Sequence, residues 1–409
     1  MKITAIQAFP LRASRDYVAS TGLKTPSVAG HKPAADGPPE IPGKAPAKRA
    51  LTGPRTRHIC SYPRGVQSLL VKVHTDAGIT GIGESHAPVA PQVAKAIIEH
   101  LLGSSLLGED PRAVDVLWEK MASTMRLRGH TTGFLTEAIS GIDIALWDIL
   151  GKSVGLPIYR LLGGGYATRI KAYASGVPGK TRQEQVANAR RFVEELGFTA
   201  VKGSIGRNSL ELDVAAMAAL ADALGRDAHL LVDAHGAYSA QEATQIGLEL
   251  QALGVYWFED PLMPEDHAGY KLLSDRLDMA VAAGETECNR YQFRDRLAAR
   301  AVDIILPDVC RAGGISEGLK IARLADVHHT PWAAHVSMGT PIHIAAALHL
   351  AAATPNCLIC ECPTHQNPIG NRLLKTPIVC TDGFFHVPEG PGLGIELDED
   401  ALENVILHT

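Results

Sequence analysis

Aromatic residues and excess basic charge are both scarce in this sequence. Phe, Trp and Tyr make up 5% of its 409 residues, and the formal net charge is -5 at pH 7. Nucleic-acid partners normally require a basic face and aromatic side chains for base stacking, so this composition argues against one. Long apolar runs are missing as well, because no stretch approaches the roughly 18 uninterrupted apolar residues of a membrane span. We therefore expect neither a nucleic-acid partner nor a membrane partner.

Cysteine is also infrequent. The seven cysteines are odd in number and lack the spacing of a disulfide framework, which fits a reducing cytoplasm. The N-terminal residues MKITAIQAFPLRAS alternate like a strand and lack the apolar run of a signal peptide. Cys360 and Cys362 flank Glu361 in LICEC, so on a strand both sulfurs face away from Glu361. We interpret both cysteines as packing residues rather than zinc ligands, and we expect a cytoplasmic protein.

The chain is rich enough in apolar residues to bury a large core. Hydrophobic residues make up 46% and charged residues 20% of the chain, as in a soluble globular protein. Because 409 residues exceed one ordinary core, we expect more than one domain. We predict an α+β domain over residues 1–130, alternating strands and helices over 131–375, and a Gly/Pro-rich segment, 376–409, that returns to the first domain.

Residues 12–64 form a long segment rich in Pro, Lys and Arg, without a sustained period. It is either a disordered insertion or a lid whose basic residues reach an anionic ligand. After it, SLLVKVHTDAGITGIGE predicts two strands around an AG turn, and residues 90–125 have a helical pattern.

Eight short apolar runs with polar ends follow, separated by helical segments. They are IKAYAS, TAVKGS, LLVDAH, YWFED, AVAAGE, DIILPD, PWAAH and LICEC. Their polar ends recur at regular distances, for example 26 residues from Asp233 to Glu259 and 26 more to Glu285. One strand, one helix and two loops need about this length, so the spacing predicts a closed parallel barrel with its site at the C-terminal rim. A doubly wound sheet is the alternative, but no glycine-rich phosphate turn follows a strand.

Three carboxylates end consecutive strands of this predicted barrel: Asp233, Glu259 and Glu285. Neighbouring strands lie about 4.8 Å apart, so the three side chains converge. They would repel one another unless a cation lay between them. A single such carboxylate is more often a helix cap or an ion-pair partner. Three in register indicate a hard divalent cation, and we predict Mg²⁺, whose octahedral shell leaves room for water and substrate.

The next strand ends carry Asp308, His335 and Glu361. A carboxylate beside an imidazole fixes its tautomer and raises its basicity, which suits a general base near neutral pH. Glu361 either hydrogen-bonds a substrate oxygen or pairs with an arginine at the rim.

Two same-face pairs occur earlier in the barrel. Lys202 and Ser204 are two residues apart on one strand, and so are Asp233 and His235, although His235 can lie in the following loop. Lys202 near the cation would stabilise developing negative charge. His235 is either a loop histidine with a structural partner or an acid that protonates a leaving group. Together these groups predict removal of the proton α to a substrate carboxylate.

These motifs resemble the enolase superfamily, and specifically its mandelate racemase-like subgroup. The resemblance spans nearly the whole chain and is carried by DAGITGIGE, AISGIDIALWDILGK, WFEDPL, AAGETE, ILPDVCRAGGISE and GPGLGIE. It implies a (β/α)₇β modified TIM barrel under an N-terminal α+β capping domain completed by the C-terminal segment. It also implies Mg²⁺ on Asp233, Glu259 and Glu285, an Asp308–His335 base, and Glu361 as an electrophilic or hydrogen-bonding partner.

The chain departs from the racemases of this subgroup at one position. Their second strand ends in Lys-x-Lys, whereas VKGS keeps Lys202 and has Ser204 in the second place. VDAHGAY instead resembles the galactonate and mannonate dehydratases, in which the histidine at the position of His235 protonates the departing hydroxyl. The resemblance therefore implies an acid-sugar dehydratase. Alternatives are a cycloisomerase of a sugar-acid lactone or anhydro sugar acid, a racemase or epimerase, or a catalytically silent binding protein.

Substrate contacts are predicted at Ser204 and in two basic segments. In residues 12–64 the candidates are Arg15, Lys24, His31 and Lys32; in MRLRGHTTGF they are Arg126, Arg128 and His130. The resemblance further implies a homo-oligomer, a dimer or an octamer.

Overall fold

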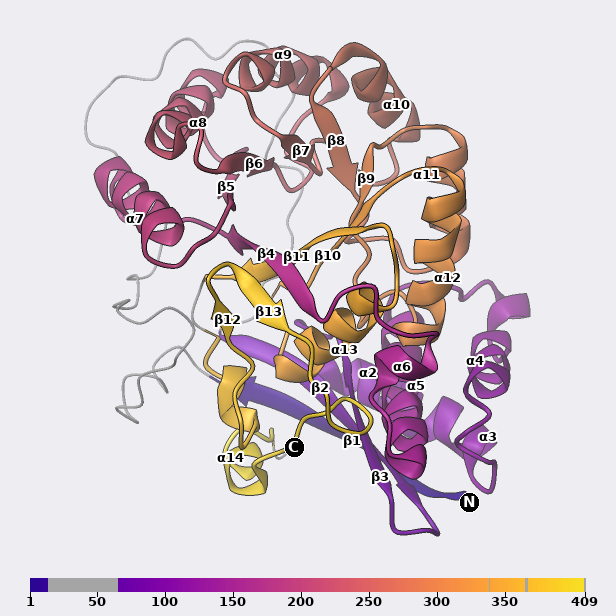
Figure 1. The fold of residues 1–409 in the computed structure, drawn as a ribbon. Coiled ribbons are helices and arrows are strands. Elements are labelled where there is room, and N and C mark those ends of the chain that lie inside the picture. The colour runs from indigo at the N-terminus through magenta and orange to yellow at the C-terminus, as the bar shows by residue number, and fades with distance from the viewer. Residues whose placement is uncertain (14–64, 338, 365–366, 408–409) are drawn as a thin grey trace.

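The structure is a computed structural model, and it describes residues 1–13, 65–337, 339–364 and 367–407. The predicted contacts Arg15, Lys24, His31 and Lys32 lie outside these residues, as does nearly all of the predicted lid segment. Figure 1 shows the two layers of the fold, a small antiparallel sheet with its helices below a barrel.

The small sheet contains β1 (Ile3–Ala13), β2 (Val66–Thr75) and β3 (Thr80–Ser85) in that order, all antiparallel. Five helical segments follow it: α2 (Pro91–Ile97), the π-helix η2 (Ile98–Leu102), α3 (Gly103–Leu106), α4 (Val114–Ser123) and the 3₁₀ helix η3 (Arg126–Arg128). The long helix α5 (Phe134–Val154) packs directly against β3. Gly83 makes this approach possible, because a Cβ there would lie 2.0 Å from the carbonyl oxygen of Gly141.

Eight parallel strands close the barrel, because β11 pairs with β4 as well as with β10. The strands are β4 (Arg169–Ser175), β5 (Ala200–Ser204), β6 (His229–Asp233), β7 (Trp257–Glu259), β8 (Ala280–Ala283), β9 (Ile304–Ile305), β10 (Trp332–Ala334) and β11 (Cys357–Pro363). The helices between them are α7 (Arg182–Glu194), α8 (Leu210–Leu224), α9 (Ala240–Ala252), α10 (His267–Arg276), α11 (Arg290–Ala298), α12 (Gly314–Val327) and α13 (Pro341–Ala352). The predicted (β/α)₇β barrel with its capping domain is confirmed.

The alternation of side chains along β7 explains why WFEDPL ends in carboxylates. Trp257 points into the barrel, where it packs with Tyr173 and Leu231, whereas Phe258 belongs to the core between strands and helices. Glu259 then points inward again, one step nearer the C-terminal rim. Apolar side chains thus fill the barrel below, and the polar strand ends meet above them.

The C-terminal segment returns along the barrel to the small sheet (Figure 1). After the short α6 (Ile158–Leu161), the first residues of β4 pair with β13 (Phe384–His386), which forms a hairpin with β12 (Cys380–Thr381). The 3₁₀ helix η4 (Gly370–Leu373), which precedes this hairpin in the chain, contacts α14 (Glu399–Glu403), which follows it. Leu11 of β1 bridges to Ile406, and Lys72 pairs with Glu399 at 2.8 Å. The domain limits at residues 130 and 375 stay predictions.

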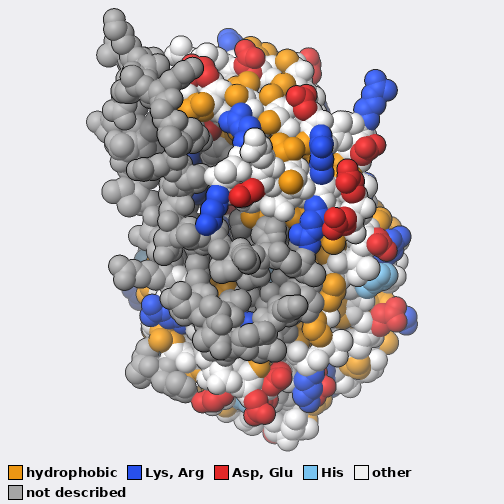
Figure 2. Space-filling view, turned by 90° about the vertical axis from the view of Figure 1, so that its left-hand side faces the viewer, with side chains coloured by type: hydrophobic (Ala, Val, Ile, Leu, Met, Phe, Trp, Pro, Cys, Tyr) orange, Lys and Arg blue, Asp and Glu red, His pale blue; other side chains and the backbone are white. Residues whose placement is uncertain are grey.

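Two surface properties bear on partners. Among the residues that the structure describes, no helix combines the length and the apolar character needed to cross a membrane. On the face shown in Figure 2, described acidic and basic side chains are interspersed with apolar ones.

Candidate active site

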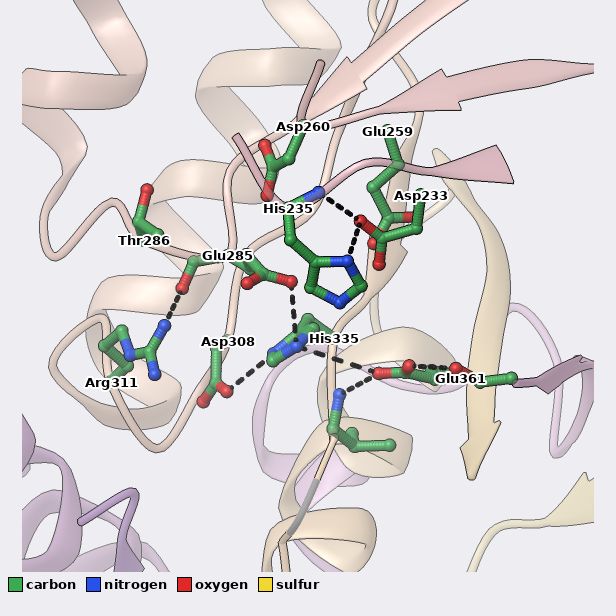
Figure 3. Close-up of polar contacts among 12 residues, drawn as sticks. Asp233, His235, Glu259, Asp260, Glu285, Thr286, Asp308, Arg311, His335 and Glu361 are labelled. Carbon is green, nitrogen blue, oxygen red and sulfur yellow. Dashed lines mark hydrogen bonds and ion pairs between the residues drawn. The ribbon is translucent and has the colours of Figure 1, made fainter. Parts of the chain in front are cut away.

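The predicted metal ligands and catalytic residues converge at the C-terminal rim of the barrel, and Figure 3 shows Asp233, His235, Glu259, Glu285, Asp308, His335 and Glu361 there. Asp233 and Glu259 end β6 and β7, and Glu285 follows β8 by two residues. Asp308, His335 and Glu361 come from the next three strands, β9 to β11. Because all eight strands are parallel, their carboxyl ends share one rim.

The three carboxylates form a compact group. Ligand atoms of Asp233, Glu259 and Glu285 all lie within 4.8 Å of one another. Asp233 and Glu259 are buried, and the indole of Trp257 donates to Glu259 Oε2 at 3.0 Å. Three hard oxygen donors at this separation fit a divalent cation of the Mg²⁺ type and leave the exposed side of the group for other ligands.

Lys202 lies beside this group with its charge facing three carboxylates. Its Nζ is 2.5 Å from Glu259 Oε1 and 3.5 Å from both Asp233 Oδ2 and Glu361 Oε1. Burial alone would lower the pKa of Lys202, but these carboxylates outweigh it and raise the pKa well above its usual value. Burial also raises the pKa of Glu259, with Lys202 opposing and Asp233 adding to the shift. The surrounding carboxylates therefore favour the charged form of Lys202 at the rim.

His335 and Asp308 form the predicted dyad. His335 Nδ1 lies 2.8 Å from Asp308 Oδ2, and both side chains are buried. Burial opposes ionisation of Asp308, yet the rings of His343 and His86 and the bond from His335 hold its pKa well below its usual range. An ionised Asp308 keeps the hydrogen on Nδ1, so Nε2 is the basic nitrogen of His335. Nε2 lies 3.2 Å from Glu285 Oε2 and therefore faces the cluster of three carboxylates.

Glu361 is held on both oxygens. Ser175 Oγ donates to Oε1 at 2.6 Å, and the backbone N–H of Val336 donates to Oε2 at 2.8 Å. These bonds, with Lys202 and His335 nearby, lower the pKa of Glu361 although burial opposes ionisation. The flanking Cys360 and Cys362 belong to the core between strands and helices, as expected for packing residues.

His235 lies in the loop directly after β6, not on the strand. Its backbone is left-handed, with φ of 50°, and its N–H donates to Asp233 Oδ1 at 3.0 Å. This conformation is costly for a non-glycine residue, and it brings Nδ1 to 3.2 Å from the same oxygen. The side chain is 46% exposed, so His235 is open to solvent while it touches a carboxylate of the group.

The remaining predicted contacts lie at the edge of the site. Ser204 is exposed at the end of β5, in register with Asp233. Arg128 and His130 are exposed on a segment that packs against residues 288–291, where Arg126 donates to the hydroxyl of Tyr291. The described bonds of Arg128 and His130 are from their backbone N–H groups to Met125. The structure thus places this segment beside the loop that follows Glu285, without joining it to the carboxylates.

Sequence reasoning missed several residues of the site. Ser175 had a usable signal, because it ends the run IKAYAS. Arg311 had none: it returns from the turn after Asp308 and donates to the carbonyl oxygen of Glu285 at 2.5 Å. His86 and His343 bring ligand atoms within 4.8 Å of Asp308. The positive charge of Arg311 also acts on His86, so we interpret this second group as a polar network rather than a metal site.

Comparisons with known proteins agree with this geometry. Residues 54–163 match the model of the mandelate racemase / muconate lactonizing enzyme N-terminal domain, and residues 184–401 match that of the enolase C-terminal domain-like family. The chain is 38% identical to the D-galactarolactone cycloisomerase of Agrobacterium fabrum, over 82% of this chain and 90% of that one. It is 35% identical to the D-xylonate dehydratase of Haloferax volcanii, over 82% and 84%. It is 34% identical to the D-galactonate dehydratase of Pectobacterium atrosepticum, over 84% and 92%.

The two family models match in the same order as the two layers of the fold, and the relatives match over more than four fifths of the chain. The chain therefore belongs to the enolase superfamily, within the mandelate racemase / muconate lactonizing enzyme group.

Proposed function

We propose that this protein is a Mg²⁺-dependent acid-sugar dehydratase, a hydro-lyase that converts a sugar acid into a 2-keto-3-deoxy acid and water. Relatives named D-xylonate and D-galactonate dehydratases support the reaction class. The observation that carries the proposal is that two imidazoles contact the cluster of three carboxylates. His335 contacts Glu285, and His235 contacts Asp233.

Asp233, Glu259 and Glu285 would hold the cation. When bound, Mg²⁺ would supply positive charge beside the substrate carboxylate, which acidifies the α-proton and offsets the charge of an enediolate. Lys202, a buried cation 3.5 Å from Asp233 and from Glu361, adds to this positive field.

Proton removal is assigned to His335. Its Nε2 takes the C2 proton of the substrate, and the C–H electron pair forms the enediolate. Asp308 stabilises the imidazolium that results and holds its Nδ1–H. Glu361, fixed by Ser175 and Val336, lies ready to hydrogen-bond a substrate oxygen.

Loss of water is assigned to His235. The enediolate electron pair forms the C2–C3 double bond, the C3–O bond breaks, and a proton from His235 completes the departing water. The resulting enol then becomes the 2-keto-3-deoxy acid. The 46% exposure of His235 suits an acid that must be reprotonated from solvent after each turnover.

The test is to incubate the purified protein and Mg²⁺ with aldonic and aldaric acids and to assay 2-keto-3-deoxy products by mass. A product lighter than its substrate by one water supports the proposal. Absence of such a product from every acid, with Mg²⁺ binding demonstrated, contradicts it.

A cycloisomerase is the second candidate, because the relative from A. fabrum carries that name. It would use the same proton removal by His335 but expel a ring oxygen. Product mass separates the two, since isomerisation conserves mass. A two-base racemase or epimerase fits less well, because Ser204 stands where a second base is needed, and a hydroxyl does not deprotonate carbon at neutral pH.

Three predicted contacts belong to this proposal as binding residues. Ser204 at the rim, and Arg128 and His130 on the segment beside the loop after β8, would meet the hydroxyl groups or the distal carboxylate of the substrate. The cytoplasmic location and the homo-oligomer stay predictions, and sedimentation velocity would check the second.

A further inference from the structure

Behind the His335–Asp308 pair lies a buried group that the proposed reaction does not use. His86 follows β3 of the small sheet, and His343 lies in the first turn of α13. Their side chains are 6% and 0% exposed, and both rings pack on the Asp308 carboxylate. They therefore contact the residue that orients the proposed base.

The two oxygens of Asp308 are divided among these neighbours. Oδ2 accepts from His335 Nδ1 at 2.8 Å and lies 3.8 Å from His86 Nδ1. Oδ1 accepts from the backbone N–H of Cys310 at 2.8 Å and lies 3.2 Å from His343 Nε2. Neither ring nitrogen of His343 has an aligned hydrogen-bond partner among the described residues. The ring thus contacts Asp308 as a polar neighbour that restricts rotation of the carboxylate.

His86 also contacts both other rings edge-on. Its ring centroid lies 6.2 Å from that of His335 and 5.9 Å from that of His343, with interplanar angles of 73° in both pairs. Its backbone N–H donates to the carbonyl oxygen of Cys310 at 3.0 Å, and Cys310 is the residue whose own N–H holds Asp308. His86 therefore contacts the dyad through its ring, and its backbone bonds the residue whose N–H holds Asp308.

Glu84 connects this arrangement to the small sheet. Its buried carboxylate accepts from the backbone N–H groups of Thr340 at 3.0 Å and His343 at 3.0 Å, at the N-terminus of α13. It also accepts from Ser68 Oγ at 2.6 Å within its own sheet. A carboxylate at a helix N-terminus satisfies N–H groups that lack helical partners. One strand end thus holds the helix that carries His343 and also delivers His86.

We propose that His86 and His343 are positioning residues for the base, which hold the Asp308 carboxylate toward His335 Nδ1, so that the capping sheet takes part in orienting the catalytic dyad. The inference rests on the proposed function, because orientation of His335 affects the rate only if His335 removes the proton. By this inference, the end of β3 helps to orient the base and also joins the small sheet to the barrel.

The experiment uses the full-length Mg²⁺-loaded protein and four variants at these positions. His343→Leu and His86→Leu remove the polar ring and keep much of its volume. His343→Gln and His86→Asn restore an N–H near the position of the lost ring nitrogen. The matched control is His349→Leu, since His349 is a buried histidine on the same helix that bonds to the carbonyl oxygen of Leu393 instead.

Both leucine variants should lower kcat and C2–deuterium exchange about ten-fold or more with little change in KM, the range typical of lost orienting partners. The two amide variants should recover part of kcat. His349→Leu should lower the melting temperature and leave kcat unchanged. Leucine variants whose kcat equals that of the wild type, or that lose activity only in step with the control, overturn the inference.

A spectroscopic measurement separates this inference from the proposed function. The His335 Nδ1–H bound to Asp308 should give a downfield proton resonance that disappears in His335→Asn. It should shift or broaden in both leucine variants and stay in place in His349→Leu. If the wild type turns over no sugar acid, the proposed function fails, and an unshifted resonance in the leucine variants then overturns the inference separately.

Discussion

His335 and Asp308 meet through a 2.8 Å contact although 27 residues separate them in the chain. Each follows a different strand of the barrel, and parallel neighbours bring the two strand ends to one rim. The contact leaves Nε2 of His335 facing Glu285, at 3.2 Å. This geometry gives the proposed reaction a base with a fixed tautomer, and it makes the individual steps separable by mutation.

Replacing His335 by Asn should abolish exchange of the C2 proton while Mg²⁺ binding persists. A positioned general base contributes about 10²- to 10⁴-fold to a rate, so kcat should fall by this range. Deuterium incorporation at C2, followed by mass spectrometry, measures the step directly. Exchange at the wild-type rate in this variant would assign the base elsewhere.

Replacing His235 by Asn should separate the two halves of the reaction. The C2 proton should still exchange, because His335 and Asp308 are unchanged, but water should no longer leave. We expect 2-keto-3-deoxy product to fall by about 10²-fold or more while deuterium uptake continues. Equal loss of exchange and product would show that His235 acts before elimination.

Replacing Glu259 by Gln should weaken Mg²⁺ binding strongly. Even the outer partners of metal ligands are worth about 10- to 100-fold in affinity, so loss of a carboxylate ligand should cost at least as much. Isothermal titration calorimetry with Mg²⁺ measures the change. Glu265→Gln, on the loop after β7, is a control that should bind like the wild type.

Removal of Mg²⁺ by a chelator should stop turnover and lower the melting temperature. A cation that binds only the folded protein stabilises it by mass action. It also offsets the burial and the repulsion from Asp233 and Glu285 that raise the pKa of Glu259. Thermal unfolding at increasing Mg²⁺ concentrations should show a rising midpoint, and this rise should be absent in Glu259→Gln.

Acid should destabilise the fold through His349. Burial lowers its pKa from 6.5 to about 4, because the charged ring has no water around it. Below pH 6.5 His349 binds a proton in the unfolded chain, whereas in the folded chain it binds this proton only below about pH 4. Stability is therefore lost as pH falls through this window, by roughly 3 kcal/mol in total. Chemical denaturation of the wild type and His349→Gln between pH 4 and pH 7 should show a shallower loss in the variant.

Regular spacing made most of the barrel and its carboxylates predictable. Strand ends that recur every 23 to 27 residues in the sequence indicate repeated βα units, because each unit needs that length, and the absence of a glycine-rich turn after a strand favoured the barrel over a doubly wound sheet. Asp233, Glu259 and Glu285 follow from the spacing alone, and so does the pairing of Asp308 with His335. Local periodicity and chain length carry this information.

Contacts across the fold did not follow from spacing. Ser175 meets Glu361 only because the last strand closes on the first, and Arg311 reaches Glu285 only through a turn whose path the sequence does not specify. Residues 12–64 supplied predicted substrate contacts that periodicity could neither place nor exclude.

The sequence by itself determined the barrel and the acidic residues at its rim, and it predicted the base, because those depend on repeats along one chain. Only the tertiary structure decided what surrounds the base. His86 reaches Asp308 from a separate sheet, and His343 reaches it from the end of a helix. Such contacts depend on how helices and strands pack against one another, and a local sequence pattern does not encode this packing.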